Sequence, residues 1–203
     1  MTERERGLAR AVRVMDRLRS PGGCPWDAEQ THDSLARYLI EEAYEAVDAI
    51  DGQDREHLRE ELGDVLLQVL FHARIAAEHP DRPFDIDDVA DALCDKLERR
   101  HPHVFGDTEV SGAAEVTANW DAIKAAEKQR TGPYDGITWS APALTVASAV
   151  VRRERRAAAQ VRVPEGDDAG KVAADLLEVV RRADDLGVDP ETALRAALRA
   201  ATR

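Results

Sequence analysis

The chain has few aromatic residues, few cysteines and no long apolar run, and each shortage excludes a class of protein. Phe, Trp and Tyr make up 4% of the 203 residues, and β-branched residues rarely run together, which argues against a sheet protein. Cys24 and Cys94 are too few for a disulfide framework and lack the paired spacing of a zinc site, so we expect a reducing, cytoplasmic location. No apolar stretch approaches the roughly 18 residues that cross a bilayer, so we expect no membrane association.

Positive charge is scarce as well. The chain has 28 Lys and Arg against 40 Asp and Glu, a formal net charge of -12. Because affinity for nucleic acids comes largely from basic residues that neutralise phosphates, we expect no nucleic-acid polymer as a partner. A nucleotide would need a metal ion to bind so acidic a protein, and carboxylates that repel one another are stabilised by a divalent cation.

Ala, Leu, Glu and Arg dominate the chain, and apolar residues recur at helical spacing. The pattern predicts helices over residues 8–18, from a cap at Asp33 or Thr31 to residue 51, over 54–79 and over 85–100, with loops over 24–32 and 101–106. Four helices with short connections predict an all-α fold with a four-helix bundle. In the second helix, Leu39, Val47 and Ile50 are among the residues expected to face inward, and the third helix should be the centre of the core. Additional C-terminal helices are expected from Val116 to Gln129, over 142–160, up to residue 186 and from residue 190.

Two acidic pairs carry the candidate chemistry. Glu42 and Glu45 are three residues apart and project from one helix face, and Glu61 and Asp64 repeat this spacing on the next helix. If a short turn at Gly52 makes the two helices antiparallel, the four carboxylates converge in the groove between them. Such hard oxygen ligands favour magnesium or manganese. The alternative is an ordinary solvated acidic face, but uncompensated charge in so apolar a helix would be costly.

Four motifs follow one another in the chain: Cys24-Pro25-Trp26-Asp27, Glu41-Glu42-x-x-Glu45, Glu61-x-x-Asp64 and Arg99-Arg100-His101-Pro102-His103. In order and spacing, residues 8–125 resemble the MazG family, and specifically its N-terminal repeat. The resemblance implies magnesium-dependent hydrolysis of nucleoside triphosphates to a monophosphate and pyrophosphate, as house-cleaning of the nucleotide pool, by a homodimer. No arrangement of residues for a covalent nucleophile competes with this interpretation.

The resemblance also implies residue roles. Glu42, Glu45, Glu61 and Asp64 would be ligands of Mg²⁺, with Mn²⁺ as a second possibility, and Glu41 would act beside them as a catalytic, water-orienting carboxylate. Trp26 could stack on a base or equally plug a small core. Lys96 and Arg100 could meet the triphosphate or equally stabilise a helix C-terminus.

By the same comparison the chain divides into a MazG-type domain over residues 1–130 and, over 131–203, a linker and a degenerate C-terminal helical repeat. In that repeat Val172 occupies the Glu position of a Glu-x-x-Asp motif that ends at Asp175. Two alternatives stay open. One is a noncatalytic nucleotide-sensing or protein-interaction module, and the other is a related all-α enzyme for dUTP, dCTP or phosphoribosyl-ATP.

Overall fold

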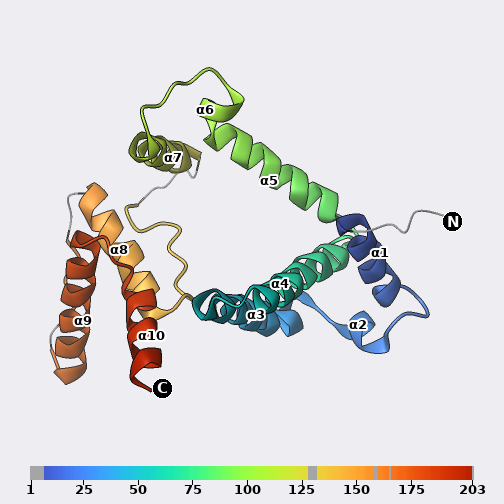
Figure 1. Cartoon of the computed structure of the whole chain (residues 1–203), viewed down its shortest axis with the longest axis horizontal. Coiled ribbons are helices and arrows are strands. Elements are labelled where there is room, and N and C mark those ends of the chain that lie inside the picture. The colour runs from blue at the N-terminus through green and yellow to red at the C-terminus, as the bar shows by residue number, and fades with distance from the viewer. Residues whose placement is uncertain (1–6, 128–131, 158–159, 165, 203) are drawn as a thin grey trace. The chain divides into compact units, whose positions relative to one another are not determined.

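The computed structural model describes residues 7–127, 132–157, 160–164 and 166–202 (Figure 1). The described residues form helices and no strands, which confirms the all-α fold with additional C-terminal helices. The chain divides into two compact units, Met1–Ser111 and Gly112–Arg203. This division after Ser111 differs from the predicted domain boundary at residue 130, which is placed where the sequence resemblance to a MazG repeat ends. The predicted helix end at Gln129 and the predicted linker start at residue 131 lie outside the described residues.

The first unit contains α1 (Leu8–Arg19), α2 (Pro25–Glu29), α3 (His32–Gly52), α4 (Arg55–Ala76), α5 (Ile86–Arg100) and α6 (Pro102–Phe105). Local capping explains where the longer helices begin. The Thr31 hydroxyl accepts a hydrogen bond from the backbone N–H of Ser34 at the start of α3, and Asp85 caps α5 in the same way. The short helices α2 and α6 lie in segments expected to be loops, and each has a proline in its first turn.

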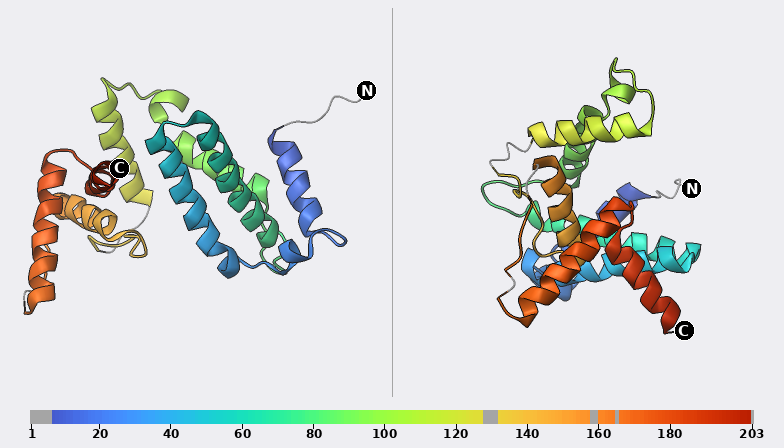
Figure 2. Two further views of the ribbon diagram at one scale, coloured as in Figure 1. Left: turned by 60° about the horizontal axis from the view of Figure 1, so that its bottom comes forward. Right: turned by 90° about the vertical axis from the view of Figure 1, so that its left-hand side faces the viewer.

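Helices α3 and α4 form an antiparallel hairpin, in which the two lie side by side (Figure 2). Helix α3 runs through Gly52, one residue beyond its expected end, and Gln53 then adopts the left-handed conformation at φ 54°. Asp54 starts α4, because its carboxylate accepts hydrogen bonds from the backbone N–H groups of Glu56 and His57. This tight turn places the acidic segments of the two helices opposite each other.

The core of this unit lies where α1 and α3 pack on the C-terminal half of α4. Met15, Leu35, Leu70 and Phe71 are its buried members. The expectation that Leu39, Val47 and Ile50 face inward is wrong within this chain, because their exposed fractions are 38%, 38% and 56%. Helix α3 buries instead Leu35, Ala46 and Ala49. Much of the apolar face of α3 is therefore exposed, because no other described part of the first unit packs against it.

Arg19 ties three helices of this unit together. Its guanidinium donates to the backbone carbonyls of Asp27 and Gln30 around α2, and it meets the carboxylate of Glu78 beyond α4 through two 2.9 Å contacts. Only 7% of the Arg19 side chain is exposed. The hydrogen bonds and charge of Arg19, and then those of Arg74, hold the pKa of Glu78 below its usual value. The loop and α2 are thus anchored to the hairpin.

Helix α5 is the fourth long helix of the unit, and it differs from the others in its packing. Ile86, at its start, packs against the core, but none of its residues is buried. From that start α5 diverges from α4 (Figure 1). Leu93 and Leu97 on α5 are 46% and 42% exposed. The four helices of a bundle are present, and α5 is left with an apolar side that the first unit does not cover.

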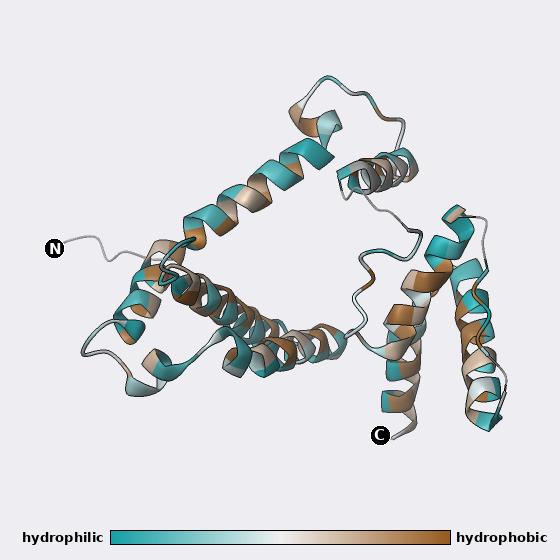
Figure 3. Ribbon diagram, turned by 180° about the vertical axis from the view of Figure 1, so that it is seen from behind, coloured by the Kyte–Doolittle hydropathy of each residue, from teal (hydrophilic) through white to brown (hydrophobic). Residues whose placement is uncertain are grey.

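The second unit contains α7 (Ala113–Glu127), α8 (Ala143–Ala157), α9 (Asp168–Asp185) and α10 (Pro190–Ala201). Val151, Leu177 and Val180 form its buried core between α8 and α9, and hydrophobic residues are seen along these helices (Figure 3). A buried ion pair joins the two, since Arg181 contacts Glu154 at 2.9 Å and Glu154 also accepts from the backbone N–H of Val161. No helix in the described part of the chain is long and apolar enough to cross a membrane.

Candidate metal centre

Three carboxylates meet on the α3–α4 hairpin. Glu42 and Glu45 from α3 and Glu61 from α4 each offer an oxygen, and these oxygens lie within 4.8 Å of one another. Glu61 is buried, at 6% exposure, whereas Glu42 is partly buried and Glu45 is exposed. The antiparallel turn described above produces this convergence. The cluster is therefore open to solvent on the α3 side and closed on the α4 side.

The pKa values of Glu42 and Glu45 are both raised. Partial loss of solvent raises the pKa of Glu42 most, and repulsion from Asp64, Glu45 and Glu61 raises it further. The pKa of Glu45 is raised in the same way, and its carboxyl lies within hydrogen-bonding reach of Glu61. Two carboxyl groups can make such a bond only by sharing a proton. A cation bound in the cluster would replace that proton and neutralise the repulsion between the carboxylates.

Glu61 has one oxygen committed and one open. Its Oε1 lies 2.8 Å from Nε2 of His57, one helical turn earlier on α4. Its Oε2 is buried and, with the carboxylates ionised, has no hydrogen-bond partner. Such an orphaned buried oxygen is costly unless a proton or a cation meets it. Sequence reasoning missed His57, although its spacing of four residues from Glu61 was a usable signal.

These observations fit a hard divalent cation. The donors are all carboxylate oxygens, the type of ligand that Mg²⁺, Mn²⁺ and Ca²⁺ prefer. Repulsion from neighbouring carboxylates contributes to the raised pKa of Glu42 and Glu45, and Oε2 of Glu61 is a buried ligand atom without a hydrogen-bond partner. The hairpin can thus hold a divalent metal.

The other predicted acidic residues lie beside the cluster. Asp64 on α4 is partly buried and repels both Glu42 and Glu45, but the three-carboxylate group does not include it. Glu41 is exposed on α3, and its charge also raises the pKa of Glu42 and Glu45. The whole acidic excess lies in this unit, since residues 1–111 hold 26 Asp and Glu against 14 Lys and Arg, whereas 112–203 hold 14 of each.

The three residues predicted to bind substrate, Trp26, Lys96 and Arg100, lie on helices other than the α3–α4 hairpin that carries the carboxylates. Trp26 on α2 is 51% exposed, and its ring meets Tyr38 and Phe71 edge to face at centroid distances of 6.3 Å each. It both covers the core and offers an open face. Lys96 and Arg100 lie on the diverging helix α5, away from the hairpin of their own chain. Within one chain the structure therefore separates these two basic residues from the acidic cluster.

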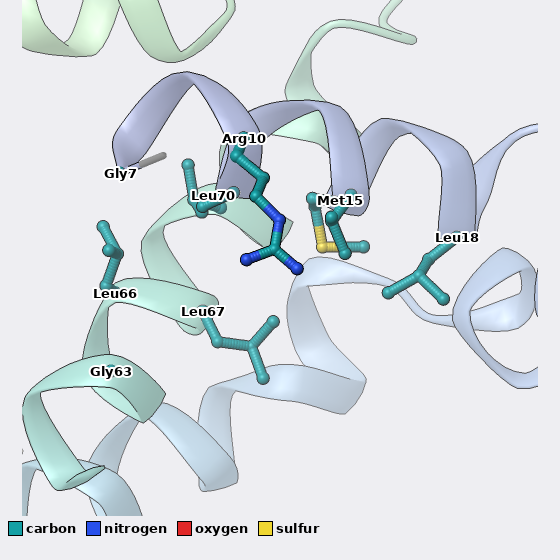
Figure 4. A pocket seen from close by; sticks show the side chains of 10 residues that line it. Gly7, Arg10, Met15, Leu18, Gly63, Leu66, Leu67 and Leu70 are labelled. Carbon is teal, nitrogen blue, oxygen red and sulfur yellow. The ribbon is translucent and has the colours of Figure 1, made fainter. Parts of the chain in front are cut away.

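A separate apolar pocket of about 350 Å³ lies between α1 and α4 (Figure 4). Met15, Leu18, Leu66, Leu67 and Leu70 line it, and the guanidinium of Arg10 extends over it. From the acidic segment of α4, the pocket is lined by Gly63, which lies between Glu61 and Asp64. No carboxylate lines this pocket, so it is distinct from the candidate metal centre.

Comparison with known proteins agrees with the motifs. The family profile described as the MazG nucleotide pyrophosphohydrolase domain matches residues 30–105, which include both acidic pairs. A Thermotoga maritima protein named nucleoside triphosphate pyrophosphohydrolase/pyrophosphatase MazG is 42% identical over 213 residues, covering 93% of this chain and 80% of that protein. The chain belongs to the MazG family. The predicted resemblance to that family is thus confirmed.

Two further relatives show how much of a MazG protein this chain represents. An uncharacterized 26.1 kDa protein of Streptomyces cacaoi is 53% identical over 191 residues, covering 94% of this chain and 77% of that protein. A nucleoside triphosphate pyrophosphohydrolase of Mycobacterium tuberculosis is 43% identical over 198 residues, covering 97% of this chain and 56% of that protein. This MazG chain thus spans little more than half the length of its mycobacterial relative.

Proposed function

We propose that this MazG chain hydrolyses nucleoside triphosphates to a nucleoside monophosphate and pyrophosphate, using Mg²⁺, as house-cleaning of the cytoplasmic nucleotide pool. The observation that carries the proposal is the convergence of Glu42, Glu45 and Glu61, with an orphaned buried oxygen on Glu61. Membership of the family and the pyrophosphohydrolase activity for which its relatives are named support the same reaction. Manganese is the second candidate for the metal.

We assign the metal to Glu42, Glu45, Glu61 and Asp64, which supply only oxygen ligands. When bound, a divalent ion neutralises phosphate charge and lowers the pKa of an attacking water. Glu61 provides a rigid ligand from the buried side of the hairpin, and the α3 carboxylates provide adjustable ones from the open side. Glu41, exposed next to Glu42, is assigned to orient the water and accept its proton.

We assign Trp26 to the nucleobase, because half of its indole is exposed while its edge is held by two aromatic neighbours. Lys96 and Arg100 are assigned to the triphosphate in a homodimer. Two features support the dimer: α5 buries none of its residues, and the apolar face of α3 is largely exposed. The second unit, with Val172 in place of an acidic residue, is proposed to be a degenerate repeat without a site of its own.

Release of pyrophosphate tests this function. The protein is incubated with magnesium and a panel of purine and pyrimidine triphosphates, and Glu61→Gln is compared with Glu60→Gln. Both variants remove one negative charge from α4, but Glu60 is exposed and outside the cluster. Glu61→Gln should lower the rate of pyrophosphate release by about 100-fold or more, because replacing even a residue that only contacts a metal ligand typically lowers metal affinity or activity by 10–100-fold. Release from the wild type no greater than from Glu61→Gln would leave a noncatalytic nucleotide-binding module instead.

A further inference from the structure

We propose that His57 is a positioning residue of the metal centre, a role that rests on the metal-dependent function proposed above. His57 Nε2 lies 2.8 Å from Oε1 of Glu61, within the range of a direct hydrogen bond. A ring N–H that donates there occupies one carboxylate oxygen and leaves Oε2 as the free ligand atom. His57 does not touch substrate in this assignment; it determines which oxygen of Glu61 is available.

The link from His57 to Glu61 is anchored at the hairpin turn. Asp54 accepts a hydrogen bond from the backbone N–H of His57 at 3.1 Å, so the position of His57 is set by the cap that starts α4. Its side chain then reaches Glu61 one turn along the same helix. A chain of contacts therefore runs from the α3–α4 turn to the buried ligand. It ties the metal centre to the geometry of that turn.

The burial of Glu61 makes this contact matter. With 6% exposure, Glu61 has almost no water to satisfy its oxygens, and Oε2 already lacks a partner. Without His57, Oε1 would lose the contact with the imidazole ring as well. A ligating carboxylate held by an outer hydrogen bond keeps its orientation, and loss of such partners typically weakens metal binding by 10–100-fold.

An exposed ion pair on the same turn provides the contrast. Arg59 lies 2.6 Å from Glu56, and both side chains are more than three-quarters exposed, at 78% and 77%. Neither residue belongs to the carboxylate group at the hairpin. If the His57 contact were only an ordinary surface pair, removing it would resemble removing the Arg59 pair, with little effect on the metal.

The test measures Mn²⁺ binding to the full chain at one fixed pH, by electron paramagnetic resonance of the free ion. The variants are His57→Ala, His57→Gln, which keeps an N–H donor, and Arg59→Ala as the matched control. His57→Ala should bind Mn²⁺ about 10–100-fold more weakly, with a small change in the metal-free Tm. His57→Gln should recover most of the affinity, and Arg59→Ala should match the wild type.

A second readout separates this role from the proposed reaction. With His57→Ala, the magnesium concentration for half-maximal pyrophosphate release should rise, while kcat at saturating magnesium should stay near that of the wild type. Unchanged Mn²⁺ affinity in His57→Ala, or an equal loss in Arg59→Ala, would overturn the role even if the enzyme is active. The predicted order of Mn²⁺ affinities in a protein that releases no pyrophosphate would support the positioning and refute the reaction alone.

Discussion

Replacing Glu42 by Gln should stabilise the metal-free protein, although it removes a proposed ligand. The pKa of Glu42 is raised above its ordinary 4.5 by partial burial and by neighbouring carboxylates. A carboxyl whose pKa is higher in the folded state costs stability at any pH above that raised pKa. As the pH falls towards 4.5 and below, the group is protonated in both states and the cost disappears. The gain from Glu42→Gln should therefore be present at neutral pH and absent in acid.

The size of the effect follows from the geometry. Charges whose oxygens lie within 4.8 Å of one another, in a partly solvated cluster, repel by on the order of 1 kcal/mol. For a chain of this length that corresponds to a rise of about 2–4 °C in Tm. In magnesium the wild type should have a higher Tm than Glu42→Gln, because a ligand at 100 times its Kd stabilises the wild type by about 2.7 kcal/mol.

Calorimetry of the wild type, Glu42→Gln and Glu60→Gln, in EDTA and in magnesium, provides the assay. Glu60→Gln changes the net charge equally but lies outside the cluster. A lower Tm for Glu42→Gln in EDTA at neutral pH would refute the reasoning. An equal rise for Glu60→Gln would also refute it, because the gain would then come from net charge and not from the cluster.

Three further outcomes concern stability. Arg19→Ala should lower the free energy of unfolding by about 2 kcal/mol, because the backbone carbonyls of Asp27 and Gln30 lose their donor while Glu78 keeps its contact with Arg74; a loss below about 1 kcal/mol in urea titration would contradict this anchor. Glu154→Gln should cost about 3 kcal/mol at neutral pH, because the Arg181 hydrogen bond lowers the pKa of Glu154 in the folded state. The cost should decline once the pH falls below the ordinary value of 4.5 and disappear below that lowered pKa, and a cost independent of pH would disprove the pairing. Gln53→Gly should gain about 0.5–1 kcal/mol at the left-handed turn, measured as a higher Tm, whereas a loss would mean that the Gln53 side chain has a role of its own.

Features set by neighbouring residues were predictable from the sequence. The starts of α3 and α5 follow from Thr31 and Asp85, which cap the backbone within one turn of themselves. The meeting of Glu42 and Glu45 with Glu61 follows from helical spacing and a short turn. These arguments need only local geometry, and a helical hairpin has few other ways to close.

Features that depend on what covers a helix were not predictable. Periodicity identified the apolar face that holds Leu39, Val47 and Ile50, but it does not tell which element lies against that face. Periodicity likewise does not tell whether α5 packs along α4. In the structure α5 diverges from α4, which separates Lys96 and Arg100 from the carboxylates of their chain. Hydrophobic periodicity gives no information on His57, and its spacing of four residues from Glu61 was the signal that indicated their contact.

The confinement of the acidic excess to residues 1–111 has a consequence for the response to ionic strength. Residues 112–203 hold equal numbers of acidic and basic residues, so the net charge of -12 belongs to the first unit alone. Monovalent salt screens repulsion between charges beyond about 10 Å at 0.1 M. Added salt should therefore stabilise the first unit and leave the second nearly unchanged, so that hydrogen exchange slows with salt in α3 and α4 but not in α8 and α9.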